Sequence, residues 1–124
     1  GAAGGLAGGL AVAGATLASG FDAVADELEL HELIEGADLV VTAEGFLDEQ
    51  SFDGKVVGGV AALAAESGVP CVAVVGEVVD GLAAPPALPE VVSLVERFGV
   101  DRARTDTVAC IEEVAADVLA ACRR

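Results

Sequence analysis

Two short runs of β-branched and other apolar residues constrain the fold more than any other feature of this sequence. They are Asp38-Leu-Val-Val-Thr-Ala43 and Pro70-Cys-Val-Ala-Val-Val-Gly76, and each is bounded by polar residues, glycine or proline. Continuous apolar runs of this kind are typical of strands buried on both faces, as in parallel sheets. Residues 91–95 form a third, weaker strand candidate, which follows a loop predicted over residues 81–89.

Helical patterns alternate with these strands. The spacing of apolar residues predicts helices over residues 22–35, 55–67 and about 107–122. Strands that alternate with helices of this length predict right-handed βαβ crossovers and a parallel sheet covered on both faces. We therefore expect an α/β fold, a Rossmann-like or flavodoxin-like three-layer unit, with residues 1–124 forming one compact unit. A sheet of this class usually has about five to six strands, so we expect further strands from sequence outside this chain.

Charge and composition exclude several classes of partner. Six Lys and Arg against 21 Asp and Glu give a formal net charge of −15, which would repel a nucleic acid or an anionic membrane. Residues 1–21 carry no charge, but they are mostly Gly and Ala and lack a basic start, so we predict neither a membrane span nor a signal peptide. The 3 cysteines show no Cys-x-x-Cys spacing, which argues against a disulfide framework or a zinc site and favours a cytoplasmic protein. The chain contains no Met, and we expect it to be a piece of a longer polypeptide.

The segment that follows the first predicted strand is the richest candidate site, because open parallel sheets bind ligands beyond the carboxyl ends of their strands. Carboxylates beside a lysine at a helix start suit a magnesium nucleotide: hard oxygens hold the metal, while the lysine and backbone amides take phosphate oxygens. A solvated acidic loop, with Gly54 as its turn residue, is the alternative. The polar residues of this segment are Glu44, Asp48, Glu49, Gln50, Ser51, Asp53 and Lys55.

The glycine-rich opening, residues 1–9, is a second candidate. Glycines before a helix let backbone amides approach an anion closely, although a Gly/Ala-rich helix also serves simply for close packing. The chain has no Walker A sequence and no G-x-G-x-x-G motif after a strand, which disfavours P-loop kinases and standard dinucleotide-binding enzymes.

A series of short motifs follows along the chain, in an order and spacing that hold from residue 1 to about residue 76. They are Gly1-Ala-Ala-Gly-Gly-Leu, Ser19-Gly-Phe-Asp22, Ala37-Asp-Leu-Val-Val-Thr-Ala-Glu-Gly45, Asp48-x-Gln50-Ser51, Gly54-Lys55 and Gly59-Val-Ala61. Together they resemble the C-terminal part of the glycerate kinases that form 2-phosphoglycerate.

The resemblance implies a two-domain α/β kinase that uses ATP and Mg²⁺ to phosphorylate glycerate in a cleft between its domains. In this hypothesis Glu44 and Asp48 organise the metal or the hydroxyl of the sugar acid, and Lys55 neutralises phosphate charge. Amides of the opening loop, with Gly1, Gly4 and Gly5, would complete the site. The remaining positions that match the family signature are Gly45, Gln50, Ser51 and Gly54.

Two residues depart from the family signature, which usually reads glycine-glutamate-glycine-arginine. Ala43 stands for the first glycine and Phe46 for the arginine, and phenylalanine cannot replace a bidentate donor to phosphate or carboxylate. The family's N-terminal lysine-serine segment and its other glycine- and aspartate-rich motifs also do not occur in this chain, so the chain alone, without the rest of the cleft, is expected to be inactive. The alternatives are a non-catalytic family member that binds a small molecule or a partner, and a phosphate-binding α/β domain unrelated to glycerate. Apolar surface left where further strands would pair is expected to make the isolated chain prone to dimerise or aggregate.

Overall fold

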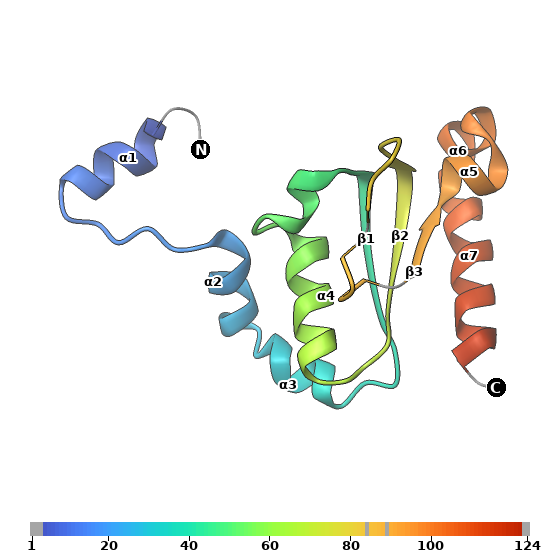
Figure 1. Ribbon diagram of the computed structural model, residues 1–124, viewed down its shortest axis with the longest axis horizontal. Helices are drawn as coiled ribbons and strands as arrows, with labels where there is room; N and C mark the ends of the chain where they lie inside the picture. Colours follow the sequence, from blue (N-terminus) through green and yellow to red (C-terminus); the bar gives the residue numbers. More distant parts are fainter. Residues whose placement is uncertain (1–3, 84, 89, 123–124) are drawn as a thin grey trace.

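The computed structural model describes residues 4–83, 85–88 and 90–122. Helices and strands alternate along most of the chain (Figure 1). In chain order the elements are α1 (Gly5–Val12), α2 (Gly20–Glu27), α3 (Leu30–Glu35), β1 (Val40–Leu47), the 3₁₀ helix η2 (Glu49–Phe52), α4 (Val56–Glu66), β2 (Cys71–Val78), β3 (Glu90–Ser93), α5 (Leu94–Phe98), α6 (Val100–Thr105) and α7 (Thr107–Cys122).

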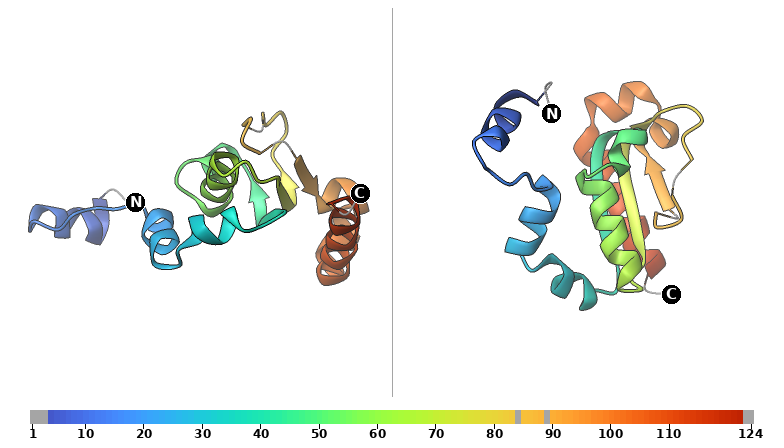
Figure 2. Two further views of the ribbon diagram at one scale, coloured as in Figure 1. Left: turned by 90° about the horizontal axis from the view of Figure 1, so that it is seen from below. Right: turned by 60° about the vertical axis from the view of Figure 1, so that its left-hand side comes forward.

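The strands form one parallel sheet in the order β1-β2-β3, which confirms the predicted α/β class and its Rossmann-like character. β2 lies in the centre, with Val40 opposite Cys71 on one side and Val72 opposite Glu90 on the other. Seen from below, α4 and α7 lie on opposite sides of the strands, which gives the three layers that alternating strands and helices predict (Figure 2).

Side chains of β2 divide between two cores. Cys71, Ala73 and Val75 join the cluster beneath α4, where Val57 and Ala61 are also buried. Val74 points the other way and packs with residues of α5, α6 and α7, among them Leu94, Ala103, Cys110 and Val114. This division follows from the two-residue period of a strand, and it explains why β2 reads as a continuous apolar run.

Side chains along β1 and β2 point alternately to the two faces of the sheet, and this alternation is interrupted at a pair of facing glycines. A Cβ atom on Gly76 would lie 2.4 Å from the carbonyl oxygen of Gly45, so the two backbones approach more closely than any side chain permits. Beyond this point Leu47 and Val78 both join the α4 core, although an unbroken period of two from Val75 would place Val78 on the opposite face. The side chains of the intervening residues therefore turn toward the α5–α7 face.

The first predicted helix, over residues 22–35, is in fact two helices. Glu29 adopts a left-handed backbone with φ 51° and separates α2 from α3. In one continuous helix, Ala25 and Ile34 would lie about 2.5 turns apart and face opposite ways. The break lets both side chains be buried: Ala25 on α2 and Ile34 in the α4 core.

Other boundaries also differ from expectation. β1 and β2 run further than predicted, to Leu47 and Val78, so Glu44 and Gly45 lie within a strand and not in a loop. The third strand ends at Ser93, because the hydroxyl of Ser93 accepts a hydrogen bond from the amide of Glu96 at 3.2 Å and caps α5. α5 and α6 were not predicted, whereas the final helix occupies the predicted residues Thr107–Cys122.

The N-terminal segment contrasts with the rest of the chain. α1 lies away from the sheet in every view and has no buried residue (Figures 1 and 2). Leu6 is 80% exposed and Val12 is 92% exposed. Along the described part of the chain, no helix is both long enough and apolar enough to cross a membrane.

Candidate functional site

The carboxyl ends of the strands carry the candidate site. η2 and the start of α4 lie at this end on one side of β1 and β2, and α5 and α6 lie at the same end on the other side (Figure 1). This is the edge at which open parallel sheets bind ligands.

An open cavity of about 550 Å³ lies between α2, β1 and the start of α4. Its size falls within the range of about 300–1,000 Å³ that is usual for small-molecule sites. Apolar side chains dominate its wall, and Glu44 and Lys55 are the two charged residues in it. The wall consists of Gly20, Phe21, Val24, Ala25, Leu28, Leu30, Ala43, Glu44, Gly54, Lys55, Val56 and Val60.

Glu44 presents a carboxylate oxygen that the described residues leave unsatisfied. It lies on β1 opposite Val75, whose side chain belongs to the α4 face of the sheet. Its Oε1 atom is buried and has no hydrogen-bond partner among the described residues. A buried acceptor without a partner costs about 1–3 kcal/mol, and more when the group is charged. The arrangement therefore calls for a hydrogen-bond donor or a cation that the described residues do not supply.

Lys55 immediately precedes α4, and it is the one lysine of the sequence. It forms no ion pair with any described residue, which leaves its ammonium group available in the cavity. Gly54 turns the chain into the helix with φ +71°, a conformation that favours glycine. The free amides at the start of this 11-residue helix favour an anion at the same place.

Close glycine contacts bring the walls of the cavity together. A Cβ atom on Gly59 would lie 2.3 Å from the ring of Phe21, so α2 rests on α4 through this residue pair. A Cβ atom on Gly58 would lie 2.7 Å from the Cα of Phe52, which shows how tightly η2 covers the start of α4. Sequence reasoning did not assign Phe21 to the site, because a contact between residues so distant along the chain leaves no local pattern.

Asp48 and Ser51 hold the 3₁₀ helix in place. The amide of Ser51 donates to Oδ1 of Asp48 at 3.1 Å, and the amide of Asp48 donates to Oγ of Ser51 at 3.1 Å. This reciprocal capping box fixes η2, and Ser51 is fully buried. Asp48 and Gln50 line a separate cleft of about 270 Å³ together with Asp80, and they do not line the cavity of Glu44 and Lys55.

The other predicted positions are dispersed. Gly45 lines a cavity of about 330 Å³ on the α7 side of β1. Gly4 and Gly5 precede and begin α1, away from the sheet, and Gly1 lies outside the described residues. Among the described residues no group of three or more His, Cys, Asp or Glu side chains is placed to hold a metal ion. The structure thus brings together Glu44, Gly54 and Lys55.

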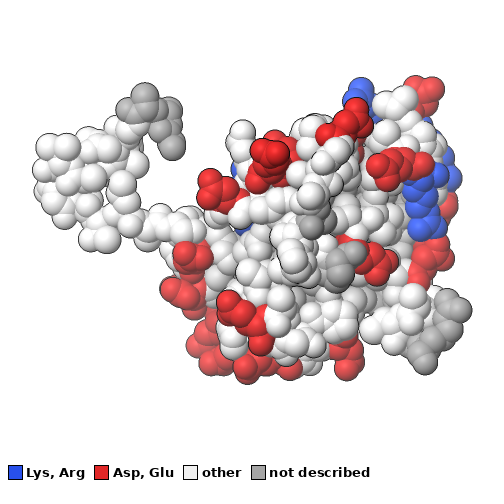
Figure 3. All heavy atoms as spheres, in the orientation of Figure 1, with Lys and Arg blue, Asp and Glu red and all other residues white. Residues whose placement is uncertain are grey.

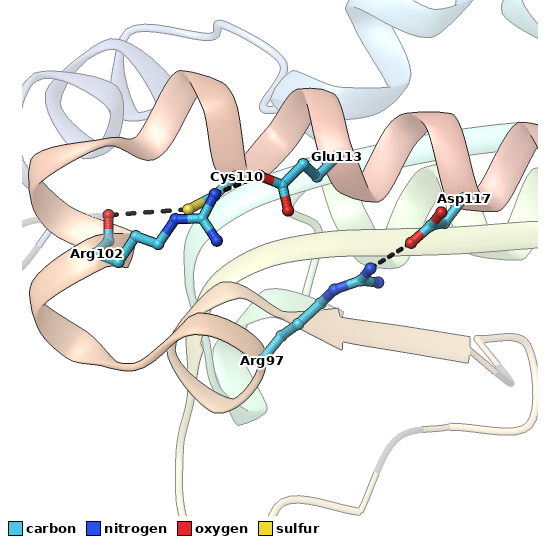
Figure 4. A network of polar contacts seen from close by, with 5 residues as sticks. All are labelled: Arg97, Arg102, Cys110, Glu113 and Asp117. Atoms are coloured by element: carbon cyan, nitrogen blue, oxygen red, sulfur yellow. Dashed lines mark hydrogen bonds and ion pairs between the residues drawn. The ribbon is translucent and has the colours of Figure 1, made fainter.

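The α5–α7 side is organised by ion pairs (Figure 4). Arg97 pairs with Asp117, and Arg102 pairs with Glu113, so that α5 and α6 are fastened to α7. Both guanidinium groups also lie near the ring of Phe98, at 5.2 and 4.7 Å from its centre. The hydrogen bond to Glu113 raises the pKa of Arg102 above its ordinary value.

The environment of Cys71 does not favour a reactive thiol. Burial raises the pKa of the Cys71 thiol, which disfavours the reactive thiolate. Cys110 is also buried, and its thiol lies 3.8 Å from the carbonyl oxygen of Arg102.

Taken together, the described residues form a parallel α/β unit with a lysine at a helix start and an unsatisfied carboxylate at the carboxyl edge of its sheet. A model of the glycerate kinase family matches residues 1–123 of this sequence. The chain therefore belongs to the glycerate kinase family.

Two of the relatives described here are named as glycerate kinases. The chain is 44% identical over 82 residues to the glycerate kinase of Halalkalibacterium halodurans, a match that covers 65% of this chain and 22% of that protein. It is 38% identical over 102 residues to the glycerate 2-kinase of Escherichia coli, covering 82% of this chain and 24% of that protein. An uncharacterized protein of Synechocystis is 49% identical over 78 residues, covering 62% of this chain and 21% of that protein. The chain thus spans about a quarter or less of the length of these relatives.

Proposed function

We propose that this chain supplies one wall of the active site of a glycerate kinase, which transfers the γ-phosphoryl group of Mg-ATP to glycerate and forms 2-phosphoglycerate. The hydroxyl oxygen of the acceptor forms a bond to the γ-phosphorus, the bond from that phosphorus to the β–γ bridging oxygen breaks, and the hydroxyl proton is released. ADP is the second product. The observation that carries the proposal is the pairing of an unsatisfied Glu44 carboxylate with a free Lys55 ammonium in one cavity at the carboxyl edge.

Lys55 and the start of α4 suit phosphate oxygens. Phosphoryl transfer depends mainly on positioning and on stabilising the charge of the transferred group. An ammonium group and free helix amides at one point provide such stabilisation. The apolar wall around Phe21 and Val60 limits access of water to that charge and so strengthens the interaction.

Glu44 suits either the hydroxyl group of the acceptor or the magnesium ion. Its unsatisfied oxygen is a hard ligand of the kind that Mg²⁺ prefers, and it can equally accept the proton of a hydroxyl group. Magnesium in kinase sites is usually held by one or two carboxylates together with phosphates and water, so one protein oxygen here fits such an ion. When bound, the ion neutralises the charge that develops on the phosphates. Asp48 serves the site by fixing η2 through the capping box, and its free carboxylate surface faces the neighbouring cleft.

The proposed reaction belongs to the whole protein. The chain matches only 21–24% of the length of the relatives described above, and the wall that would close the cavity over Glu44 and Lys55 must come from elsewhere. The test therefore uses the full-length protein that contains this chain.

A coupled assay of ADP release with Mg-ATP and D-glycerate tests the proposal directly. We expect turnover by the wild-type protein and a loss of about a hundredfold or more in kcat for Glu44→Gln and for Lys55→Gln. Glu66→Gln, at the exposed end of α4, is the matched control for the first variant and should retain wild-type kcat. Equal kcat in Glu44→Gln and Glu66→Gln would overturn the assignment of Glu44.

Phe46 carries a second candidate function. This residue is 49% exposed at the end of β1, where the family signature has an arginine, and it favours a non-catalytic member that binds a small molecule. The variant Phe46→Arg separates the two functions in the same assay. Activity gained only in the variant indicates a family scaffold whose substrate has changed, whereas inactivity of both proteins supports the binding module.

A further inference from the structure

One long edge of the sheet has no partner among the described residues. β1 lies at the end of the strand order β1-β2-β3 and pairs with β2 alone. The amide of Val40 donates to the carbonyl oxygen of Pro70 at 2.9 Å, so the backbone of Val40 faces β2. Because backbone groups along a strand point alternately to its two sides, Val41 and Ala43 direct their N–H and C=O groups away from β2. These are the groups with which a further strand would pair.

The sequence of β1 is unusual for an edge strand that stays in water. Natural edge strands are commonly protected by lysine, proline or other charged residues. The chain has a formal net charge of −15, and its acidic side chains (red) are spread over the face shown in Figure 3. Residues 40–47 nevertheless contain one charged residue, Glu44, and apart from Thr42 the others are apolar or glycine. Such a composition is typical of a strand that has a neighbour on each side.

Apolar cavities lie beside this edge on both faces of the sheet. The cavity of about 550 Å³ described above includes Ala43, Val24 and Leu28 in its wall. The cavity of about 330 Å³ lies beside α7, where Val41 is 50% exposed and Ile111 is 45% exposed. A strand added to β1 would direct alternate side chains toward the two cavities. Strands that are buried on both faces in this way are characteristic of parallel sheets.

The position of α2 and α3 fits a strand on the free side of β1. α2 lies beside α4, on the side away from β2, and its Phe21 ring packs against Gly59 of α4 (Figures 1 and 2). α3 shares this face of the sheet, because Ile34 is buried in the α4 core. Crossovers between parallel strands are right-handed in about 98% of cases. Since α4 connects β1 to β2, the same handedness requires helices that lead into β1 from its free side to lie on the α4 face, where α2 and α3 are found.

We propose that β1 is an internal strand in the full-length protein, and that a parallel strand from the polypeptide preceding α1 pairs with its free edge. The relatives described above leave enough chain for this strand, since their matches cover only 21–24% of their length. A parallel strand ends at the same edge of the sheet as β1. The residues that follow it therefore lie beside Glu44 and Lys55, where they can supply the donor that the Oε1 atom of Glu44 lacks.

Amide hydrogen exchange in the full-length protein, resolved to single residues, tests the inference. Val40 is the internal control, because its amide is already bonded to β2. We expect Val41 and Ala43 to exchange at rates within about tenfold of Val40, because amides bonded within one sheet become accessible together. Exchange at Val41 and Ala43 that is faster than at Val40 by more than about a hundredfold would overturn the inference. The measurement uses no substrate, so its result is independent of the proposed kinase activity.

A second copy of the protein could also cover this edge. The exchange is therefore repeated on dilute protein that light scattering shows to be monomeric. Protection of Val41 and Ala43 that persists in the monomer supports a strand from the same polypeptide. Protection that disappears in the monomer would overturn the inference, since the covering strand would then belong to another molecule.

A proline substitution provides an independent measurement. Proline has no N–H group, and it is tolerated in an edge strand whose N–H faces solvent but not inside a sheet. Ala43→Pro should lower the unfolding midpoint of the full-length protein, whereas the matched control Ala43→Ser keeps the amide and should change the midpoint much less. Equal midpoints in the two variants would overturn the inference. If Ala43→Pro does not fold, the exchange rates of the wild-type protein still decide.

Discussion

The two ends of this chain are packed in opposite ways. The part from β1 onward is the more closed: Val57 and Ala61 of α4 are buried against the sheet on one side, and on the other side α5 and α6 are fastened to α7 by two ion pairs over the buried Cys110 and Val114. The N-terminal part is open, because α1 has no buried residue, and Val24 of α2 and Leu28, which follows α2, leave more than half of their surface exposed. The two halves differ in degree, since α7 also leaves Val108 and Leu119 more than half exposed, but the open half buries far fewer of its apolar side chains.

The candidate site lies where the open and closed halves meet. The cavity of Glu44 and Lys55 is walled by α2, which belongs to the open half, and by β1 and α4, which belong to the closed half. A mutation in the closed half should therefore change the stability of the chain, whereas one in the open half should act on ligand binding or on contacts outside it.

The largest effect is expected at the glycine pair of the central strands. Gly76→Ala would place a Cβ atom 2.4 Å from the carbonyl oxygen of Gly45, and backbone cannot move aside as a side chain can. We expect the free energy of unfolding to fall by about 3 kcal/mol, at the upper end of the cost of overpacking. Denaturant titration followed by circular dichroism measures it. A variant as stable as the wild type would show that the two strands separate easily at this point.

A smaller effect is expected where the two halves meet. Gly59→Ala forces the ring of Phe21 to move, since the new Cβ atom would lie 2.3 Å from it, but the ring is a side chain and can shift. We expect a loss of about 1–2 kcal/mol in the free energy of unfolding. The displaced ring also changes the wall of the cavity, so weaker binding of ATP should accompany the loss. Unchanged nucleotide affinity in titration calorimetry would separate Phe21 from the site.

The two ion pairs that join α5 and α6 to α7 are expected to contribute little to the stability of the fold. Glu113 and Arg102 are both about half exposed, and ion pairs in contact with solvent contribute little to stability. Arg102→Gln should therefore shift the unfolding midpoint only slightly, and 1 M salt should reduce the difference between variant and wild type. A loss several times larger, measured by the same denaturant titration, would mean that the pair and the Phe98 ring act as one unit.

The sequence predicts the long helices and strands of this fold better than it predicts the breaks between short helices and the contacts between distant segments. The parallel sheet, α4 and α7 follow from periodicities that extend over many residues, and these predictions are confirmed. The break at Glu29 was missed because it depends on tertiary burial of Ala25 and Ile34, which no local pattern records. Likewise, Glu44 and Lys55 were predicted near one another from a single segment, whereas Phe21 reaches their cavity through a contact between distant segments.

The smallest effect on the unfolding midpoint is expected for a substitution in α1. This substitution tests whether the open half unfolds independently of the closed half. Gly9→Ala meets nothing within 4 Å, and alanine favours a helix over glycine by about 1 kcal/mol. Because α1 buries no residue, it opens independently of the sheet, so a gain in its local stability does not add to global unfolding. We expect the 124-residue chain to show slightly more helical signal in circular dichroism and an unchanged unfolding midpoint.

The same variant in the full-length protein gives the matched control. If the exposed face of α1 packs closely against the rest of the protein, the added methyl group meets a neighbour there, and the midpoint falls although the isolated chain is unaffected. A midpoint that is unchanged in both proteins would mean that α1 remains exposed in the full-length protein as well. Leu6 and Leu10, both exposed on α1, would then be the residues to replace next, to test whether their apolar side chains contribute to the stability of the full-length protein.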